Sequence, residues 1–153
     1  MAEILVIVPC GQGKIWDSEP DHGPVAAHDA YTGAPFKVNR AYAERFASYW
    51  VILSAKYGFI PPDFLIPGPY NVTFKKKTTN PITVDMLRQQ IQAQQLNRFD
   101  ELIGLGGHDY RSMVEAAFAD TPVRRQYPFA GLTLGKAMQA EKRAIAHGQF
   151  SVT

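Results

Sequence analysis

Three short apolar runs, separated by segments with helical periodicity, constrain the fold of this 153-residue chain more than any other feature. The runs are Ile4–Val8, Trp50–Leu53 and Leu102–Leu105. Strands that are apolar on both faces are typical of a parallel sheet covered by helices. Alternation of such strands with helices favours βαβ units. The sequence therefore predicts an α/β fold: a three-layer sandwich with a mostly parallel sheet of three to five strands and helices on both faces.

Four segments between and after these runs carry a helical pattern. The predicted helices are Phe36–Tyr49, Thr83–Leu96, Asp109–Phe118 and Leu132–Ala146. Asp109 is expected to cap the third helix and Gly148 to end the fourth, and a further strand is expected near Val123–Tyr127. Two long loops, Gln12–Pro35 and Tyr57–Pro81, follow the first two strands. Loops of this length in a compact domain are more often functional than idle.

Length and composition limit the class of protein. A chain of this length predicts one domain spanning residues 1–153. The net charge of +2 is too small to indicate nucleic-acid binding by itself, although a local basic patch matters more than the total. A single cysteine, Cys10, excludes an internal disulfide and suits a reducing compartment. We find no signal-peptide pattern and no apolar stretch long enough to span a membrane, and we therefore expect a cytoplasmic protein without a membrane partner.

The segment that follows the first strand is a candidate anion site. Gly11 and Gly13 permit a turn whose amides face outward, and Lys14 could neutralise an anion there. The spacing is not that of a Walker A loop, and Trp16 stands where a dinucleotide fingerprint has its third glycine. The alternative interpretation is a tight turn with a solvated lysine and a buried Cys10.

Polar residues also follow the second and third strands. Ser54 and Lys56 could both face a bound phosphate or carboxylate, or form a serine–lysine nucleophile pair. After the third strand, Gly107 releases the backbone, and His108 could act as an acid or base. Asp109 is expected to begin a helix whose N-terminus can bind an anion. The alternative in both places is a structural turn with solvated side chains.

Weaker signals lie in the two long loops. His22, His28 and Asp29 could assemble a zinc site with Cys10 or His108, but no pair has the spacing of zinc ligands, so we predict no metal site. The sequence identifies no cofactor.

The second long loop also carries a basic run, Lys75–Lys77, that could touch a phosphate backbone or remain solvated. Tyr31, Tyr57 and Tyr70 could stack on a nucleobase or simply pack within the protein.

Five stretches of the chain resemble, in order, a small bacterial and phage domain family of unknown function. They read PCGQGK, YTGAPF, LSAKYG, PY and GLTLGK. That family is distantly similar to the lysine-transferring domain of archaeosine synthase and to the peroxide-stress protein family, which is credited with DNA binding. Pro9, Cys10 and Lys14 match the start of the synthase motif, whereas Ile15 and Trp16 replace its Pro-Tyr. The resemblance implies a link to a nucleic acid or a nucleobase.

Taken with this resemblance, the sequence predicts an enzyme that recognises a nucleotide or a nucleic-acid base, of the base-modification or processing type. Its site is expected at the carboxyl edge of the sheet. The candidate catalytic residues are Cys10, Lys14, His108 and Asp109. The candidate substrate-binding residues are Gly11, Gly13, Ser54, Lys56, Tyr57, Tyr70 and Gly107. The alternatives are a non-catalytic nucleotide or nucleic-acid binding module, and loops that serve only as connectors.

Overall fold

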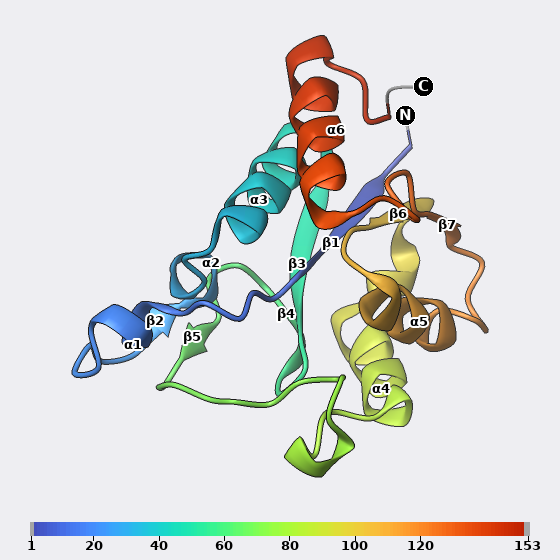
Figure 1. Ribbon diagram of the computed structural model, residues 1–153. Helices are drawn as coiled ribbons and strands as arrows, with labels where there is room; N and C mark the ends of the chain where they lie inside the picture. The colour runs from blue at the N-terminus through green and yellow to red at the C-terminus, as the bar shows by residue number, and fades with distance from the viewer. Residues whose placement is uncertain (1, 152–153) are drawn as a thin grey trace.

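The central sheet has five strands in the order β4-β3-β1-β6-β7. In the computed structural model, which describes residues 2–151, β1 (Ile4–Pro9) pairs in parallel with β3 (Tyr49–Ser54) and with β6 (Glu101–Gly104) (Figure 1). β7 (Arg124–Gln126) extends the sheet in parallel, and β4 (Gly58–Ile60) closes the other edge in the antiparallel direction. The predicted α/β fold is confirmed, and β7 confirms the strand expected near Val123–Tyr127.

Helices cover both faces of this sheet and complete the three layers (Figure 1). One face carries α3 (Ala34–Phe46) and α6 (Leu134–His147). The other carries α4 (Val84–Gln94) and α5 (His108–Ala117). None of the helices in residues 2–151 has the length and apolarity needed to cross a membrane.

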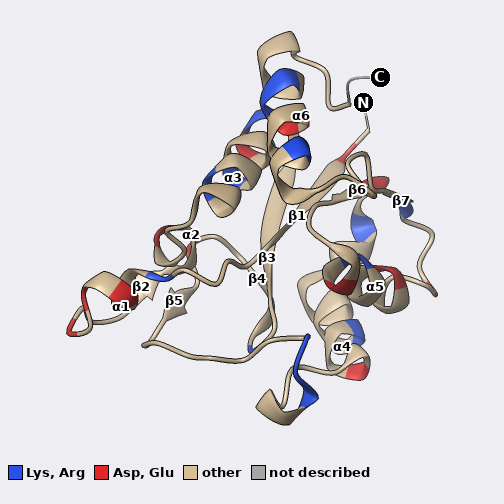
Figure 2. Cartoon of the chain, viewed as in Figure 1, with Lys and Arg blue, Asp and Glu red and all other residues tan. Residues whose placement is uncertain are grey.

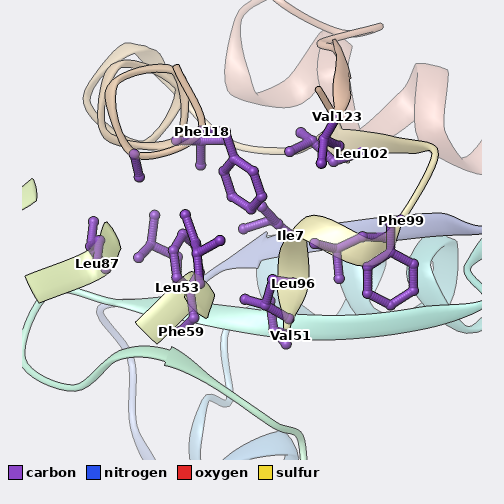
Figure 3. Close-up of a cluster of buried hydrophobic side chains, with 14 of the residues drawn as sticks. Ile7, Val51, Leu53, Phe59, Leu87, Leu96, Phe99, Leu102, Phe118 and Val123 are labelled. Carbon is purple, nitrogen blue, oxygen red and sulfur yellow. The ribbon is translucent and has the colours of Figure 1, made fainter. Parts of the chain in front are cut away.

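The apolar run of β1 is explained by its position between the two helical layers. Leu5 and Ile7 pack into the core on the α4 and α5 side, which includes Phe118 (Figure 3). Val6 and Val8 pack into the core on the α3 and α6 side. Successive side chains of a strand point to opposite faces, so a central strand needs an apolar residue at every position. Each such side chain stabilises the fold by about 1.5–3 kcal/mol through burial.

The helix boundaries differ from the sequence-based expectations: α3 begins at Ala34 instead of Phe36, and α6 begins at Leu134 instead of Leu132. α3 ends at Phe46 rather than Tyr49, because Tyr49 begins β3. α5 begins at His108 with Gly107 as its N-cap, so the expectation that Asp109 caps this helix is wrong. Asp109 instead lies in the first turn, where its negative charge still suits the helix dipole. Gly148, with φ of 69°, ends α6 as predicted.

The two long loops contain short elements that the sequence did not predict. The first holds α1 (Ile15–Ser18), β2 (Val25–Ala26) and α2 (Ala27–Ala30). The second holds β4, β5 (Leu65–Ile66) and the 3-10 helix η1 (Lys77–Thr79), while a second 3-10 helix, η2 (Leu96–Arg98), joins α4 to β6. β2 pairs with β5 in a two-stranded antiparallel sheet, which ties the two loops together.

The connections that leave β1 and β3 run over opposite faces of the sheet. The chain passes from β1 to β3 through α3, and from β3 to β6 through α4 (Figure 1). β1 therefore lies where the strand order reverses. In open α/β sheets, ligands bind beyond the carboxyl ends of the strands at such a switch point.

Candidate functional site

Side chains from five parts of the chain meet beyond the carboxyl end of β1. The half-buried thiol of Cys10 is central: its Sγ lies 3.2 Å from the hydroxyl oxygen of Tyr110 in α5. The same hydroxyl donates to the Cys10 carbonyl oxygen at 3.3 Å. We call the group the Cys10 cluster, and its members are Cys10, Lys14, Tyr31, Ser54, Lys56, Tyr70 and Tyr110.

A chain of hydroxyl groups forms the floor of the Cys10 cluster. The hydroxyl of Tyr70 is hydrogen-bonded to that of Tyr31 and lies 3.0 Å from Ser54 Oγ. Ser54 is fully buried, and its Oγ accepts the backbone N–H groups of Lys56 at 3.2 Å and Tyr57 at 3.1 Å. With two donors already bound, the Ser54 hydroxyl is left to donate its own hydrogen to Tyr70. Ser54 therefore shapes the turn after β3 and orients Tyr70, which disfavours the nucleophile role considered above.

The tyrosines of the Cys10 cluster remain protonated at neutral pH. Burial, followed by the neighbouring Cys10 sulfur, raises the pKa of Tyr31, Tyr70 and Tyr110 above the ordinary range of a phenol. Neutral phenols can donate hydrogen bonds to a ligand, but they cannot serve as general bases at this pH.

Two lysines lie against the ring of Tyr70. Lys14 Nζ is 4.6 Å from the ring centroid, and Lys56 Nζ is 5.7 Å from the same centroid. Both distances are within the range of a cation–π interaction. Lys14 Nζ also donates to the Gln12 carbonyl oxygen at 3.3 Å, and neither lysine takes part in a salt bridge within the part of the chain that the structure describes. Two uncompensated positive charges beside one ring favour an anionic ligand.

The segment after β1 is held in place by its pairing with the Tyr31 loop. Lys14 and Tyr31 form an antiparallel bridge, and Thr32 N–H donates to the Gly13 carbonyl oxygen at 3.1 Å. Neither Gly11 nor Gly13 adopts a positive φ, so this turn does not depend on the conformational freedom of glycine. The backbone pairing, rather than a glycine-rich loop, positions Cys10 and Lys14.

The turn after β3 is held by helix α4. Gly58 has a φ of 78°, which permits the reversal into β4. Gln90 on α4 donates to the Tyr57 carbonyl oxygen and accepts the Phe59 N–H, both at 2.8 Å. Gln94, one turn further along, donates to the Phe59 carbonyl oxygen at 2.8 Å. These contacts fix the backbone that carries Lys56.

The structure brings together most, but not all, of the residues predicted for the site. Cys10, Lys14, Ser54, Lys56 and Tyr70 are members of the Cys10 cluster. The ring of Tyr57 packs edge-on against that of Tyr70, with centroids 5.4 Å apart, and Gly11 and Gly13 lie in the segment between Cys10 and Lys14.

The third predicted segment contributes a different residue from those expected. The His108 side chain is 83% exposed, and its Nε2 lies 3.4 Å from Ser112 Oγ, in a separate shallow hollow. Asp109 lies beside His108, and Gly107 is exposed at the helix N-cap. Tyr110, which sequence reasoning missed as a site residue, is the side chain of α5 that reaches Cys10. Its place in the Gly-Gly-His-Asp-Tyr segment after a strand was the available signal.

The candidate metal ligands of the first long loop do not form a site with the other candidates. His28 Nδ1 lies 3.1 Å from Asp29 Oδ1, and His22 Nδ1 lies 3.0 Å from the Gly23 carbonyl oxygen. Among residues 2–151, no three histidine, cysteine or acidic side chains gather in a way that could hold a metal ion.

A basic segment adjoins the Cys10 cluster. Lys75, Lys76 and Lys77 are exposed in the loop before α4, where Figure 2 shows a continuous blue stretch. Phe74, directly before them, packs edge-on against the Tyr110 ring, with centroids 5.5 Å apart. This contact places the start of the basic segment beside the cluster.

Comparison with known proteins gives the family to which this chain belongs. Residues 5–143 match DUF6884, a family of unknown function. The chain is 41% identical over 142 residues to uncharacterized protein YfjM of Bacillus subtilis (strain 168), and the match covers 92% of this chain and 94% of YfjM. The crystal structure of AF0587, a protein of unknown function, is similar at 11% identity with a TM-score of 0.41. That similarity covers 100% of this chain, which spans 54% of AF0587. On the extent of the first two matches, the chain belongs to the DUF6884 family.

Proposed function

We propose that the Cys10 cluster recognises a nucleotide or a nucleic-acid base, and that Cys10 is the reacting group of an enzyme. The observation that carries this proposal is the pair of lysines at one aromatic ring. Lys14 from the end of β1 and Lys56 from the end of β3 both lie against Tyr70, without an acidic partner in residues 2–151.

The two ammonium groups are suited to a phosphate. A phosphate oxygen that accepts from Lys14 and Lys56 would neutralise both charges, and hydrogen bonds to charged groups are worth about 1.5–3 kcal/mol each. The neutral hydroxyl of Tyr110 adds a further donor near the thiol. An uncharged ligand would leave the two lysines uncompensated.

The aromatic side chains and the neighbouring basic segment favour a nucleotide over a simple anion. Base–aromatic stacking contributes about 1–3 kcal/mol per base, and Tyr57 and Tyr70 supply rings next to the lysines. Lys75–Lys77 could follow the phosphates of a longer strand. The distant similarity to the archaeosine synthase domain and to the peroxide-stress family supports the same class of ligand.

The Cys10 thiol favours an enzyme over a binding module. It is half-buried at the centre of the cluster and in contact with the Tyr110 hydroxyl, which is a suitable place for attack on a bound base. In the alternative, a non-catalytic module, the same cluster would bind the ligand and Cys10 would take no part in a reaction.

Lysine-to-alanine variants test the phosphate contacts. We expect Lys14→Ala and Lys56→Ala each to weaken binding of nucleoside monophosphates by roughly tenfold to a hundredfold, measured by isothermal titration calorimetry. For a single-stranded oligonucleotide, the dependence of log affinity on log salt should also fall by about 0.7 for each lysine removed. Lys142→Ala, on the exposed surface of α6, is the matched control and should bind as the unaltered protein does. If all three variants bound nucleoside monophosphates as tightly as the unaltered protein does, the proposed phosphate site would be ruled out.

Alkylation of the single cysteine tests whether the ligand reaches the thiol. Because Cys10 is the only cysteine, one iodoacetamide adduct in the intact mass reports its reaction. We expect a bound nucleotide to slow this alkylation in proportion to the occupied fraction of the protein, since the ligand covers the thiol. If the alkylation rate of Cys10 were unchanged at a saturating nucleotide concentration, Cys10 would not lie in the binding site. Conversion of a base that persists in Cys10→Ser would support the non-catalytic role for the thiol.

A further inference from the structure

A cavity of about 140 Å³ lies between α3, α6 and the end of β6. Its walls are mainly apolar, and Phe129 and Met138 contribute to them. Its polar side chains are Asn39, Arg111 and Glu141. Binding sites for small molecules combine apolar walls with a few polar groups in this way. The proposed function assigns no role to this cavity.

Asn39 of α3 brings a free amide group to the cavity. The residue is only 8% exposed, and its side chain makes no hydrogen bond within residues 2–151. Neither amide atom is sealed inside the protein, because the fully buried atoms without a partner in this part of the chain are His28 Nδ1 and Glu141 Oε1. The remaining surface of Asn39 therefore lies at the cavity that the residue lines. Buried side-chain amides are normally hydrogen-bonded, so an unpartnered one at a cavity points to a polar group of a ligand.

Arg111 of α5 brings a positive charge that no acidic side chain neutralises. The residue is half-buried and forms no salt bridge within the described part of the chain. One of its five donors, on Nη1, makes a long hydrogen bond of 3.4 Å to the Gly106 carbonyl oxygen. Gly106 and Gly107 line the cavity and lead into α5, where the N-cap residue Gly107 has no side chain to accept the first N–H groups. An unpaired guanidinium and a helix N-terminus both favour an anion.

Glu141 of α6 also lines the cavity, but it does not neutralise Arg111. Burial alone raises the pKa of this carboxyl to about 7, without an opposing contribution from a neighbouring cation. Its unpartnered Oε1 has no exposed surface, so that atom faces the protein and not the cavity. At pH 6 Glu141 is mainly neutral, and Arg111 is then the charged side chain of the cavity wall.

The charge and the size of the cavity indicate the class of ligand. A carboxylate carries one negative charge, which one guanidinium balances, and its two oxygens suit the planar fork of arginine. A phosphate dianion would leave a net negative charge among apolar walls, which costs free energy. A cavity of about 150 Å³ holds a molecule the size of benzene, so the remainder of the ligand is an apolar group of about six carbon atoms.

We infer that this cavity binds a small carboxylate with an apolar body, whose oxygens accept hydrogen bonds from Arg111 and Asn39. The apolar body packs against Phe129 and Met138. The site is separate from the Cys10 cluster, and its ligand requires neither Lys14 nor a bound nucleotide.

NMR of the methionine methyl groups at pH 6 tests this inference with benzoate as the probe. Met138 lines the cavity, whereas Met86 is exposed on α4, at the other face of the sheet, and is the internal reference. We expect benzoate to shift the Met138 signal in a saturable way and to leave the Met86 signal unchanged. Benzamide has nearly the same shape without the charge and should bind at least about tenfold more weakly. Inorganic phosphate should leave the Met138 signal unchanged.

Substitutions in the cavity wall test the two polar contacts. Arg111→Gln should weaken benzoate binding by about tenfold to a hundredfold, and Asn39→Ala by about twofold to tenfold. Arg143→Gln, on the exposed surface of α6, is the matched control and should bind benzoate as the unaltered protein does. Lys14→Ala should also bind benzoate normally, which keeps this test independent of the phosphate site. Circular dichroism checks that each variant is folded.

Four results would overturn the inference. The Met138 signal might fail to respond to benzoate, or benzamide might bind as tightly as benzoate does. Benzoate might bind Arg111→Gln and Asn39→Ala as tightly as it binds the unaltered protein. Phosphate might shift the Met138 signal as benzoate does, in which case the apolar body would contribute nothing. Loss of benzoate binding in Lys14→Ala would show instead that the two sites are not separate, and would contradict that part of the inference.

Discussion

Replacing Gly58 with alanine is expected to lower the free energy of unfolding by about 3 kcal/mol. The residue has a φ of 78°, which costs energy for any side chain that carries a Cβ. The added Cβ would lie 2.2 Å from Gln90 Oε1 and 2.7 Å from Ile82 Cδ1, so Gln90 has to move. Its hydrogen bonds to Tyr57 and Phe59 would then be lost. Urea unfolding followed by circular dichroism measures the change.

Gly68→Ala provides the matched control for this prediction. A Cβ at Gly68 would meet no atom within 4 Å, and the residue does not have a positive φ. Its replacement should change stability by no more than about 0.5 kcal/mol. A loss of equal size in both variants would mean that the turn after β3 is not held by Gln90. Because Lys56 lies on this turn, Gly58→Ala should also weaken nucleotide binding under conditions where the variant remains folded.

Glu141→Gln is expected to stabilise the protein at pH 8 by up to about 3 kcal/mol, and to have little effect at pH 4.5. Burial raises the pKa of this carboxyl from 4.5 to about 7 in the folded state. The folded protein therefore binds more protons than the unfolded chain between these pH values, and its stability falls as pH rises from 4.5 through 7. Glutamine remains neutral and removes this fall. Urea unfolding between pH 4.5 and pH 8 measures it.

The surroundings of Glu141 define the control for this pH dependence. Tyr42 from α3 is the neighbouring titratable group whose own pKa is raised, by burial and then by Glu141, and it stays neutral over this pH range. Arg111 is the other charged side chain that lines the cavity between α3, α6 and the end of β6, to which Glu141 also contributes. Glu44→Gln, at the surface, should follow the pH profile of the unaltered protein. A profile of Glu141→Gln that falls as steeply as the unaltered protein's would show that another group is responsible.

The sequence was sufficient to predict the layers of the fold because its signals were long and local. The run Ile4–Val8 is apolar at every position, and only a strand between two helical layers requires this. β4 was missed because it is a three-residue strand whose edge is satisfied by side chains of α4. Pairing of that kind joins residues about thirty positions apart, and no local pattern reports it.

The sequence could predict the site residues that directly follow a strand, because it predicts where the strands end. Residues that directly follow parallel strands meet at one edge, which is why Cys10, Lys14 and Lys56 lie together around Tyr70. The side chain that α5 contributes depends on helix rotation. Two residues rotate a helix by about 200°, so Tyr110 faces Cys10 while His108 faces solvent.

The position of Glu141 in the sequence was a weaker indication that its side chain is buried. It lies four residues after Ala137 and three before Ala144, a spacing that places it on the inward face of α6. Among small apolar neighbours, a carboxylate at such a position is unusual. It also lines a cavity that is formed by three helices and the end of a strand, and no local sequence pattern reports such a cavity because these elements are distant in the sequence.

The glutamines of α4 have a consequence beyond the turn that they hold. An edge strand normally exposes free N–H and C=O groups, which can pair with a strand from another molecule. In β4, the N–H and carbonyl groups of Phe59 are already bonded to the side-chain amides of Gln90 and Gln94. The helix thus protects this side of the sheet against intermolecular strand addition and the aggregation that follows from it, without adding a sixth strand.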